Sequence, residues 1–233
     1  MSRPQPATQD DKVLNSWHKN ASAWTQAIRS GSIESRKRVT DAAIIEAVLS
    51  LAPASVLDIG CGEGWLLRAL AGRVRTRVGV DAVSELIDQA QSAGGGTFCT
   101  AAYDDIANGT LNQRFDVAVC NFSLIGKAPV DALFQGADRF LNPGGSLVVQ
   151  TLHPLIAGEP PYTDGWRAGS WAGFGPAFKD PAPWYFRTLE SWVRLFTGNG
   201  LALKEIREPV HPVTREAASV ILIGRLEGHM SSI

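Results

Sequence analysis

Five residues between positions 58 and 81 have the types and the spacing that a nucleotide ligand requires. Asp58 is followed by glycines at 60, 62 and 64, and a second carboxylate, Asp81, comes 21 residues after Gly60. Glycine adopts positive φ easily and lets a ligand approach main-chain N–H groups, which at a helix N-terminus favour an anionic partner. An acid at that distance can accept hydrogen bonds from both ribose hydroxyls. The pattern therefore predicts a nucleotide-binding turn.

The residues on each side of the glycines indicate a turn from a buried strand into a helix. Positions 56–59 form a short, mostly apolar run of the kind that a buried parallel strand needs, and positions 65–71 carry apolar residues at helical spacing. A dinucleotide-binding turn has the pattern G-x-G-x-x-G, whereas this chain has G-x-G-x-G after an acid. Glycine spacing thus separates two ligand classes that would share Asp81.

The D-x-G-x-G-x-G pattern at 58–64 resembles motif I of the class I S-adenosylmethionine-dependent methyltransferases. A second shared feature is the turn L-N-P-G-G at 141–145, which precedes an apolar stretch at 146–151. The resemblance spans residues 55 to 151. It implies an α/β fold with a Rossmann-like seven-stranded methyltransferase sheet in the order 3-2-1-4-5-7-6, the last strand antiparallel and helices on both faces. It also implies S-adenosyl-L-methionine as the cofactor.

The resemblance assigns individual residues to that cofactor. It places Asp81 at the ribose, Asp104 or Asp105 at the adenine amino group, and Arg36 at the methionyl carboxylate, since arginine pairs bidentately with carboxylates. The other interpretations are a turn acid at 104–105 and a solvated charge at Arg36. The expected cofactor residues are Arg36, Asp58, Gly60, Cys61, Gly62, Gly64, Asp81, Ala82, Tyr103, Asp104, Asp105, Asn121, Phe122 and Ser123.

An aromatic-rich stretch follows the strand at 146–151. Residues 152–188 show no clear periodicity, and a segment of that length inside a compact domain is usually functional. We expect it to form the acceptor pocket and to close over it as a lid; the alternative is an interface with a partner. In the N-terminal extension, Trp17 and Trp24 are lid candidates by the resemblance, with ordinary core packing as the alternative. A homodimer is an open alternative to a monomer. The expected acceptor residues are Trp24, Tyr162, Trp166, Trp171, Trp184 and Tyr185.

Two histidines are candidates for a catalytic base. His153 and His211 each precede a proline beyond the central strands, and a histidine can take up a proton near neutral pH. A structural hydrogen-bonding role is the alternative for both. Cys120 lies near the end of a strand, where cytosine C5 methyltransferases place a nucleophile, but it lacks their flanking proline and is expected to be a packed thiol.

The pattern of elements predicts a single domain over residues 1–233. It divides into an N-terminal helical extension and lid (1–52), a cofactor-binding core (55–151), the acceptor segment (152–188) and a closing helix with a hairpin (189–226). Within it we expect residues 1–11 to be frayed, helices at 13–28, 41–51, 65–71, 129–141 and 189–197, and a loose tail from 226 to 233.

Composition excludes several classes of partner. The chain has 22 Lys plus Arg against 23 Asp plus Glu, so no global positive field is available to hold nucleic acid. The odd number of cysteines, with no C-x-x-C pair, indicates reduced core thiols in a cytoplasmic protein. No signal peptide and no run of about 18 apolar residues is present, so a membrane span is not expected, and no metal site is expected either.

Together these features predict methyl transfer to a small-molecule acceptor. The sequence 121–123, Asn-Phe-Ser, occupies the position of the family's motif IV but lacks the Asn/Asp-Pro-Pro-Tyr of enzymes that methylate bases or glutamine. The alternatives are an NAD-dependent oxidoreductase and a non-catalytic S-adenosylmethionine-binding regulator. The identity of the acceptor does not follow from these residues.

Overall fold

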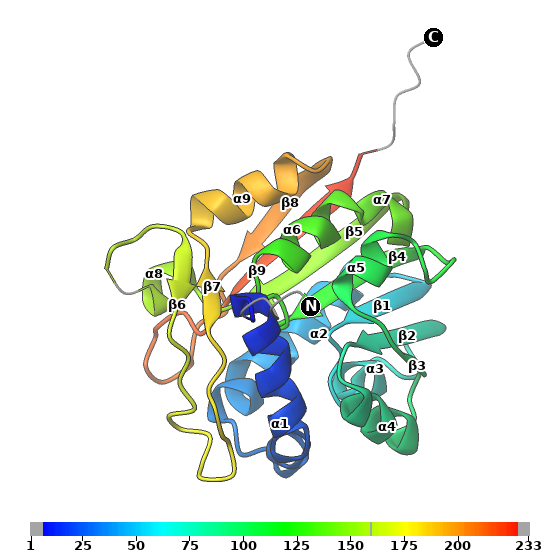
Figure 1. The fold of residues 1–233 in the computed structure, drawn as a ribbon. Coiled ribbons are helices and arrows are strands. Elements are labelled where there is room, and N and C mark those ends of the chain that lie inside the picture. The colour runs from blue at the N-terminus through cyan, green and yellow to red at the C-terminus, as the bar shows by residue number, and fades with distance from the viewer. Residues whose placement is uncertain (1–6, 159, 228–233) are drawn as a thin grey trace, which may run out of the picture.

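The computed structural model describes residues 7–158 and 160–227, and its centre is a seven-stranded sheet in the order β3-β2-β1-β4-β5-β9-β8 (Figure 1). β1 to β5 run parallel, and β9 pairs antiparallel with β5 and β8. This order confirms the predicted fold class. The strands are β1 (Ser55–Ile59), β2 (Thr76–Asp81), β3 (Thr97–Thr100), β4 (Phe115–Asn121), β5 (Leu141–Thr151), β8 (Leu201–Arg207) and β9 (Val220–Leu226).

Helices cover both faces of the sheet, as the nearly continuous apolar strands require. One face packs against α2 (Asp41–Leu49), α3 (Trp65–Ala69) and α4 (Ser84–Ala93). The other packs against α5 (Tyr103–Ala107), α6 (Ala128–Gln135), α7 (Ala137–Phe140) and α9 (Leu189–Thr197), which lie together over the sheet in Figure 1. Because side chains alternate along a strand, Leu57 and Ile59 point to the second face, and Val56 and Asp58 point to the first.

The N-terminal helix α1 (Gln9–Ser30) is longer than predicted. Thr8 and Asp11 form a capping box, in which the Asp11 amide donates to Thr8 Oγ1 at 3.1 Å and the Thr8 amide donates to Asp11 Oδ2 at 2.8 Å. The expectation of a frayed segment is therefore wrong for residues 9–11, and residues 1–6 lie outside the described part of the chain. A π-helix, η1 (Arg36–Thr40), leads directly into α2.

The helix predicted over 129–141 is interrupted at Gly136. A Cβ at this position would lie 2.5 Å from the carbonyl oxygen of Ala107, so the close approach of α5 requires glycine there. α6 ends before Gly136, α7 follows it, and β5 begins at Leu141, earlier than the predicted strand.

The aromatic-rich segment contains more regular structure than predicted. α8 (Pro154–Ala157) follows β5, and β6 (Gly165–Arg167) pairs antiparallel with β7 (Trp184–Phe186). At the C-terminus, Leu226 ends β9 and does not belong to a loose tail; residues 228–233 lie outside the described residues. Within the described residues, no helix is both long enough and apolar enough to cross a membrane.

Candidate active site

A cavity of about 320 Å³ lies at the carboxyl ends of the parallel strands. Parallel strands bring the residues that follow β1, β2, β3 and β4 to one edge of the sheet, which is where ligands bind in this type of fold. α1 lies against the same cavity through Val13, Leu14, Trp17 and Trp24. The remaining lining residues are Asp10, Asp11, Gly60, Gly62, Asp81, Ala82, Val83, Leu86, Ala102, Tyr103, Asp104, Asn121, Phe122, Ser123, Ile125, Gly126 and Pro129.

The turn after β1 needs glycine for two different reasons. All three glycines have positive φ, at 72°, 55° and 81° for Gly60, Gly62 and Gly64. A Cβ on Gly60 would lie 2.4 Å from Cβ of Ser123, so that position is closed by packing. A Cβ on Gly62 would lie 3.4 Å from Nε1 of Trp24, so it would intrude between the turn and α1. Gly62 is thus the position where backbone is open to the cavity.

The carboxylate of Asp81 is held in place by the backbone around it. Oδ2 accepts from the Gly62 amide and Oδ1 from the Val83 amide, both at 2.9 Å. Burial raises the pKa of this carboxyl above its usual value, while these amide hydrogen bonds act in the opposite direction. Ala82 lines the cavity beside it. Two oriented carboxylate oxygens at the cavity wall can accept from a pair of hydroxyl groups.

Asp58 and Arg36 lie behind the turn, away from solvent. Asp58 is 2% exposed, and burial together with the charge of Asp81 raises its pKa to about 8, opposed by Arg36. The Arg36 guanidinium stacks over Trp65 at 4.5 Å from the ring centroid, and its Nε lies 3.0 Å from Asp41 Oδ1. Its Nη2 is buried with no hydrogen-bond partner among the described residues. Arg36 is therefore a buried cation with one free donor nitrogen, not a solvated charge.

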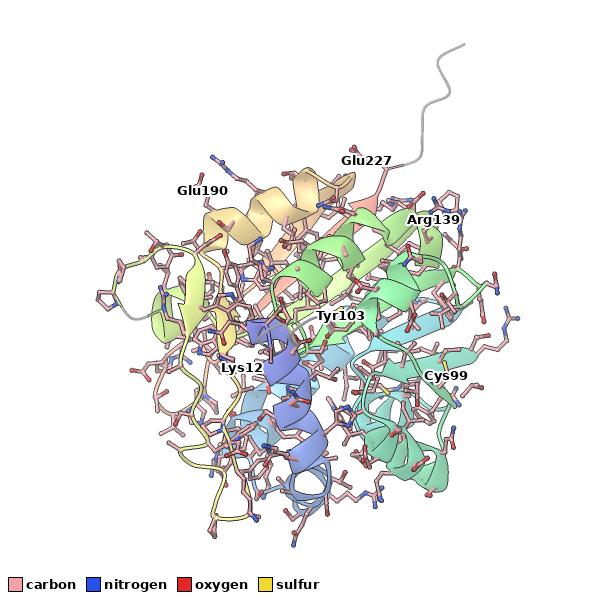
Figure 2. All side chains as sticks on the ribbon, viewed as in Figure 1. Lys12, Cys99, Tyr103, Arg139, Glu190 and Glu227 are labelled. Atoms are coloured by element: carbon pink, nitrogen blue, oxygen red, sulfur yellow. The ribbon has the colours of Figure 1, made fainter. Side chains whose placement is uncertain are left out.

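The loops after β3 and β4 form the opposite wall. Tyr103, which is labelled near the middle of the molecule in Figure 2, donates from its hydroxyl to the Ser123 carbonyl at 2.8 Å, and Ser123 Oγ donates to the Ile59 carbonyl at 2.7 Å. Desolvation raises the pKa of the Tyr103 hydroxyl above its usual value. Phe122 has φ of 54°, a strained conformation for a non-glycine residue of the kind that clusters at functional sites.

The two acids after β3 have different positions. Asp104 lines the cavity, whereas Asp105 Oδ2 accepts from the Ala102 amide at 2.9 Å at the start of α5. Of the two acids, Asp104 is the one placed to contact a ligand.

Cys61 is buried, and burial raises the pKa of its thiol. Cys61, Cys99 and Cys120 form no disulfide in the described structure.

α1 makes hydrogen bonds and aromatic contacts with residues that are distant in the sequence. Asn20 is fully buried; its Oδ1 accepts from the Lys179 amide at 2.8 Å and its Nδ2 donates to the Lys179 carbonyl at 2.7 Å. Trp171 packs edge-on against Trp17 at 5.7 Å between ring centroids. Arg29 at the other end of α1 donates to Glu63 in the glycine turn at 3.0 Å. α1 thus covers the cavity, and the aromatic segment packs against α1 without lining the cavity itself.

The expected acceptor residues are only partly brought to this cavity. Trp24 lines it and Trp171 packs behind Trp17. Trp171 does not line the cavity, and four further residues need correction because they lie in or beside the β6–β7 hairpin, outside the cavity lining of the described chain. These are Tyr162, Trp166, Trp184 and Tyr185. Their rings pack on one another and on Phe186, as in the edge-on pair of Trp166 and Tyr185.

The two candidate bases also need correction. His153 is 4% exposed; Nδ1 accepts from the Leu155 amide at the start of α8, so Nε2 carries the proton and donates to Glu208 at 2.7 Å. Both ring nitrogens are therefore engaged. In His211, Nδ1 accepts from the amides of Val213 and Thr214 within an exposed loop. Neither ring lines the cavity, and both organise loops.

Comparison with known proteins agrees with this geometry. A family model described as a methyltransferase domain matches residues 33–206, well over half of the chain. The chain belongs to the class I S-adenosylmethionine-dependent methyltransferases. It is therefore an enzyme of the transferase class with a Rossmann-like fold.

Individual methyltransferase relatives are distant. The chain is 28% identical over 152 residues to an uncharacterised methyltransferase of Mycobacterium tuberculosis, covering 64% of this chain and 75% of the relative. It is 29% identical over 163 residues to the chondramide synthase of Chondromyces crocatus, covering 63% of this chain but 4% of that protein. The N-methyltransferase NodS of Bradyrhizobium japonicum, solved with S-adenosyl-L-homocysteine, has TM-score 0.58 at 15% identity, covering 80% of this chain and 85% of NodS.

The cavity of this methyltransferase includes residues that the sequence did not single out. Asp10, Val13 and Leu14 come from the first turns of α1, Ile125 comes from the loop after β4, and Pro129 comes from the first turn of α6. The spacing of apolar residues in the sequence predicts a helix in this region. It does not predict that the helix contacts the edge of the sheet, because that contact depends on long-range packing. A search for apolar residues at the start of the extension would have found Val13 and Leu14 as candidates.

Proposed function

We propose that this methyltransferase transfers the methyl group of S-adenosyl-L-methionine to a small-molecule acceptor bound beneath α1, and that it does so as a single domain in the cytoplasm. The observation that carries the proposal is the carboxylate of Asp81, whose two oxygens are held at the cavity wall by the amides of Gly62 and Val83. A ribose presents two neighbouring hydroxyl donors, which fit that carboxylate.

The residues around the cavity fit the rest of the cofactor. Asp104 lines the cavity, and its carboxylate could accept a hydrogen bond from the adenine amino group. Next to it, the hydrogen bond from the Tyr103 hydroxyl to the Ser123 carbonyl holds the cavity wall in place. Arg36 lies outside the cavity lining of the described residues, and its Nη2 is a buried donor that would suit the methionyl carboxylate. At about 320 Å³, the cavity is within the range of small-molecule pockets. The proposed cofactor residues are therefore those that line the cavity after β1, β2, β3 and β4, together with Arg36. Asp105 is not among them, because its carboxylate caps the start of α5.

When bound, the cofactor supplies a methyl group that is already activated by its sulfonium charge. The protein then has to align the acceptor and exclude water, and these are tasks that the chain's own residues can perform. The rings of Trp17 and Trp24 line the cavity and can exclude water from it. The residues at the end of β4, positions 121–123, line the same cavity and can help to align the acceptor. Among the described residues, no histidine lines the cavity, so we propose no histidine base.

A transfer assay tests the proposal. Purified protein with methyl-labelled S-adenosyl-L-methionine is incubated with fractionated metabolite pools, and label in small molecules is measured after removal of protein. We expect label in one or a few low-molecular-weight fractions, and loss of that label in Asp81→Ala. Label found only in macromolecules contradicts the small-molecule acceptor, and tight cofactor binding without any transfer favours the regulator.

A further inference from the structure

Two buried polar atoms without a hydrogen-bond partner lie at the carboxyl ends of the central strands. They belong to a set of six such side-chain nitrogen or oxygen atoms among the described residues, one of which, Asp41 Oδ1, is ion-paired with Arg36 Nε at 3.0 Å. Native proteins keep few such atoms, because an unpaired buried polar group costs free energy, so a cluster of them indicates a missing partner. Two are amide oxygens on adjacent strands: Asn121 Oδ1 at the end of β4 and Gln150 Oε1 near the end of β5.

The two amides lie side by side on one face of the sheet. Asn121 and Gln150 are register partners between β4 and β5. They follow by two positions Val119 and Val148, which pack into the core under α2, so both side chains point to that face. Gln150 is 1% exposed, and its Nε2 donates to Ser219 Oγ at 2.9 Å. That hydrogen bond fixes the amide and leaves Oε1 as its free acceptor.

Thr40 lies above the same region. It precedes α2, and it is one helical turn before Ile44, a fully buried residue of the face that packs on the sheet. Because α2 leads back to the start of β1, the first turn of α2 lies over the carboxyl ends of the strands. Thr40 is 1% exposed, and its Oγ1 has no partner among the described residues. Thr40 therefore presents a polar group to the ends of β4 and β5 from the side of η1, opposite the two amides.

We propose that Asn121 and Gln150, beneath Thr40, form a subsite that holds the nitrogen of an amine acceptor. The inference rests on the proposed function and specifies its acceptor class. An amide oxygen only accepts hydrogen bonds, so its partner has to donate. Two amide oxygens need two donated hydrogens from one small group, which a primary amine supplies, whereas a hydroxyl has one hydrogen and a thiol is a weak donor. Asn121 lines the main cavity and Gln150 does not, so Asn121 is the member of the pair that lies next to the proposed cofactor site.

The chemistry balances without a further reactant. The amine lone pair forms a nitrogen–carbon bond to the methyl group as the carbon–sulfur bond breaks, and sulfur keeps the electron pair of that bond. The methylated ammonium then releases one proton to solvent. In this scheme Gln150 and Asn121 are positioning residues, because they orient the nitrogen and take no part in bond making.

A binding experiment tests the subsite without knowledge of the natural acceptor. Protein labelled with ¹⁵N and saturated with S-adenosyl-L-homocysteine is titrated with methylammonium chloride, and side-chain amide signals are followed by NMR. We expect saturable shifts of the Asn121 and Gln150 signals, and none with potassium chloride at equal ionic strength. No shift with methylammonium overturns the proposal and leaves ordinary water as the partner of these amides.

Variants separate this subsite from the cofactor site. Gln150→Leu is expected to weaken methylammonium binding at least about tenfold with the dissociation constant of S-adenosyl-L-homocysteine unchanged within about twofold, since one acceptor oxygen is lost. Gln150→Glu, which keeps an acceptor of the same shape and adds charge, is expected to strengthen it. Gln135→Leu, on the exposed side of α6, is the matched control and is expected to change neither. If Gln150→Leu fails to fold, Thr40→Val and Gln150→Glu carry the test.

Transfer assays give the second readout. With a panel of primary amines and their matched alcohols and thiols, we expect labelled methyl in the amines and a fall of at least about tenfold in kcat/KM for Gln150→Leu. A preference for thiols or alcohols overturns the proposal, as does a loss of S-adenosyl-L-homocysteine binding in Gln150→Leu, which would assign the pair to the cofactor. If the wild-type protein fails to bind S-adenosyl-L-homocysteine, the proposed function itself is wrong, and this outcome is distinct from the others.

Discussion

Asp81→Ala is expected to weaken cofactor binding more than any other single removal of a charge at the cavity. The carboxylate is fixed by the amides of Gly62 and Val83, so it is already oriented before a ligand arrives. Truncating one partner of a hydrogen bond to a charged group costs about 2 to 4 kcal/mol when the site is largely desolvated. That range corresponds to a dissociation constant for S-adenosyl-L-homocysteine about 30- to 700-fold higher.

The same substitution has a second, separable effect on stability. It removes the acceptors of two backbone N–H groups, and an unpaired buried amide costs about 1 to 3 kcal/mol. The cost is expected near the lower end, because the cavity gives water access to these amides. Denaturant unfolding without ligand measures this part, and isothermal titration calorimetry at a temperature where the variant is folded measures the affinity.

Asp88→Ala is the matched control for the loss of an acidic charge. Asp88 is an exposed residue on α4, so its removal is expected to leave the dissociation constant within about twofold. An Asp81→Ala protein that is folded and binds S-adenosyl-L-homocysteine with unchanged affinity would remove Asp81 from the site. It would also refute the argument that oriented carboxylate oxygens hold the ribose.

Three further predictions follow from the cavity and its cover. Gly62→Val is expected to abolish cofactor binding, since its side chain would meet Trp24 and fill the ligand approach. Gly72→Val should bind normally by calorimetry, because Gly72 also has a positive φ, 78° against 55° at Gly62, but an added Cβ there would meet nothing within 4 Å. Hydrogen exchange across residues 156–183 is expected to slow more with cofactor and an acceptor together than with cofactor alone; full protection in the free protein would refute a mobile lid. Asp58→Asn is expected to stabilise the free protein by an amount that grows from about pH 4 to about pH 8 and is constant above pH 8. The reason is that, in this range, the folded wild type holds a proton on Asp58 that the unfolded chain has released. A difference in melting temperature between variant and wild type that stays constant from pH 4 to pH 8 would contradict the raised pKa.

The cavity wall that we assign to the cofactor was predictable from sequence because its signals are local. Glycines at 60, 62 and 64 and acids at 58 and 81 lie at the ends of short apolar strands, and parallel strands bring such ends to one edge. The strand order followed from the resemblance in those same segments. Local chemistry and topology together were enough to place this wall of the cavity.

The cover and the acceptor side were less predictable because they depend on long-range contacts. Asn20 pairs with Lys179 only after α1 has crossed the sheet edge, and no spacing in the sequence indicates that pair. His153 caps α8 and donates to Glu208 from another loop, which a base prediction from residue type alone misses. The unpaired oxygen of Gln150 becomes visible only when the register of β4 and β5 is known.

Mapping the binding of S-adenosyl-L-homocysteine by backbone NMR tests the central claim most directly. The account predicts saturable shifts in three segments: the glycine turn at 60–64, residues 81–83 after β2, and residues 121–123 after β4. It also predicts that these shifts are absent when NADH replaces the ligand. Saturable shifts confined to the β6–β7 hairpin, or shifts at the glycine turn with NADH but none with S-adenosyl-L-homocysteine, would contradict it.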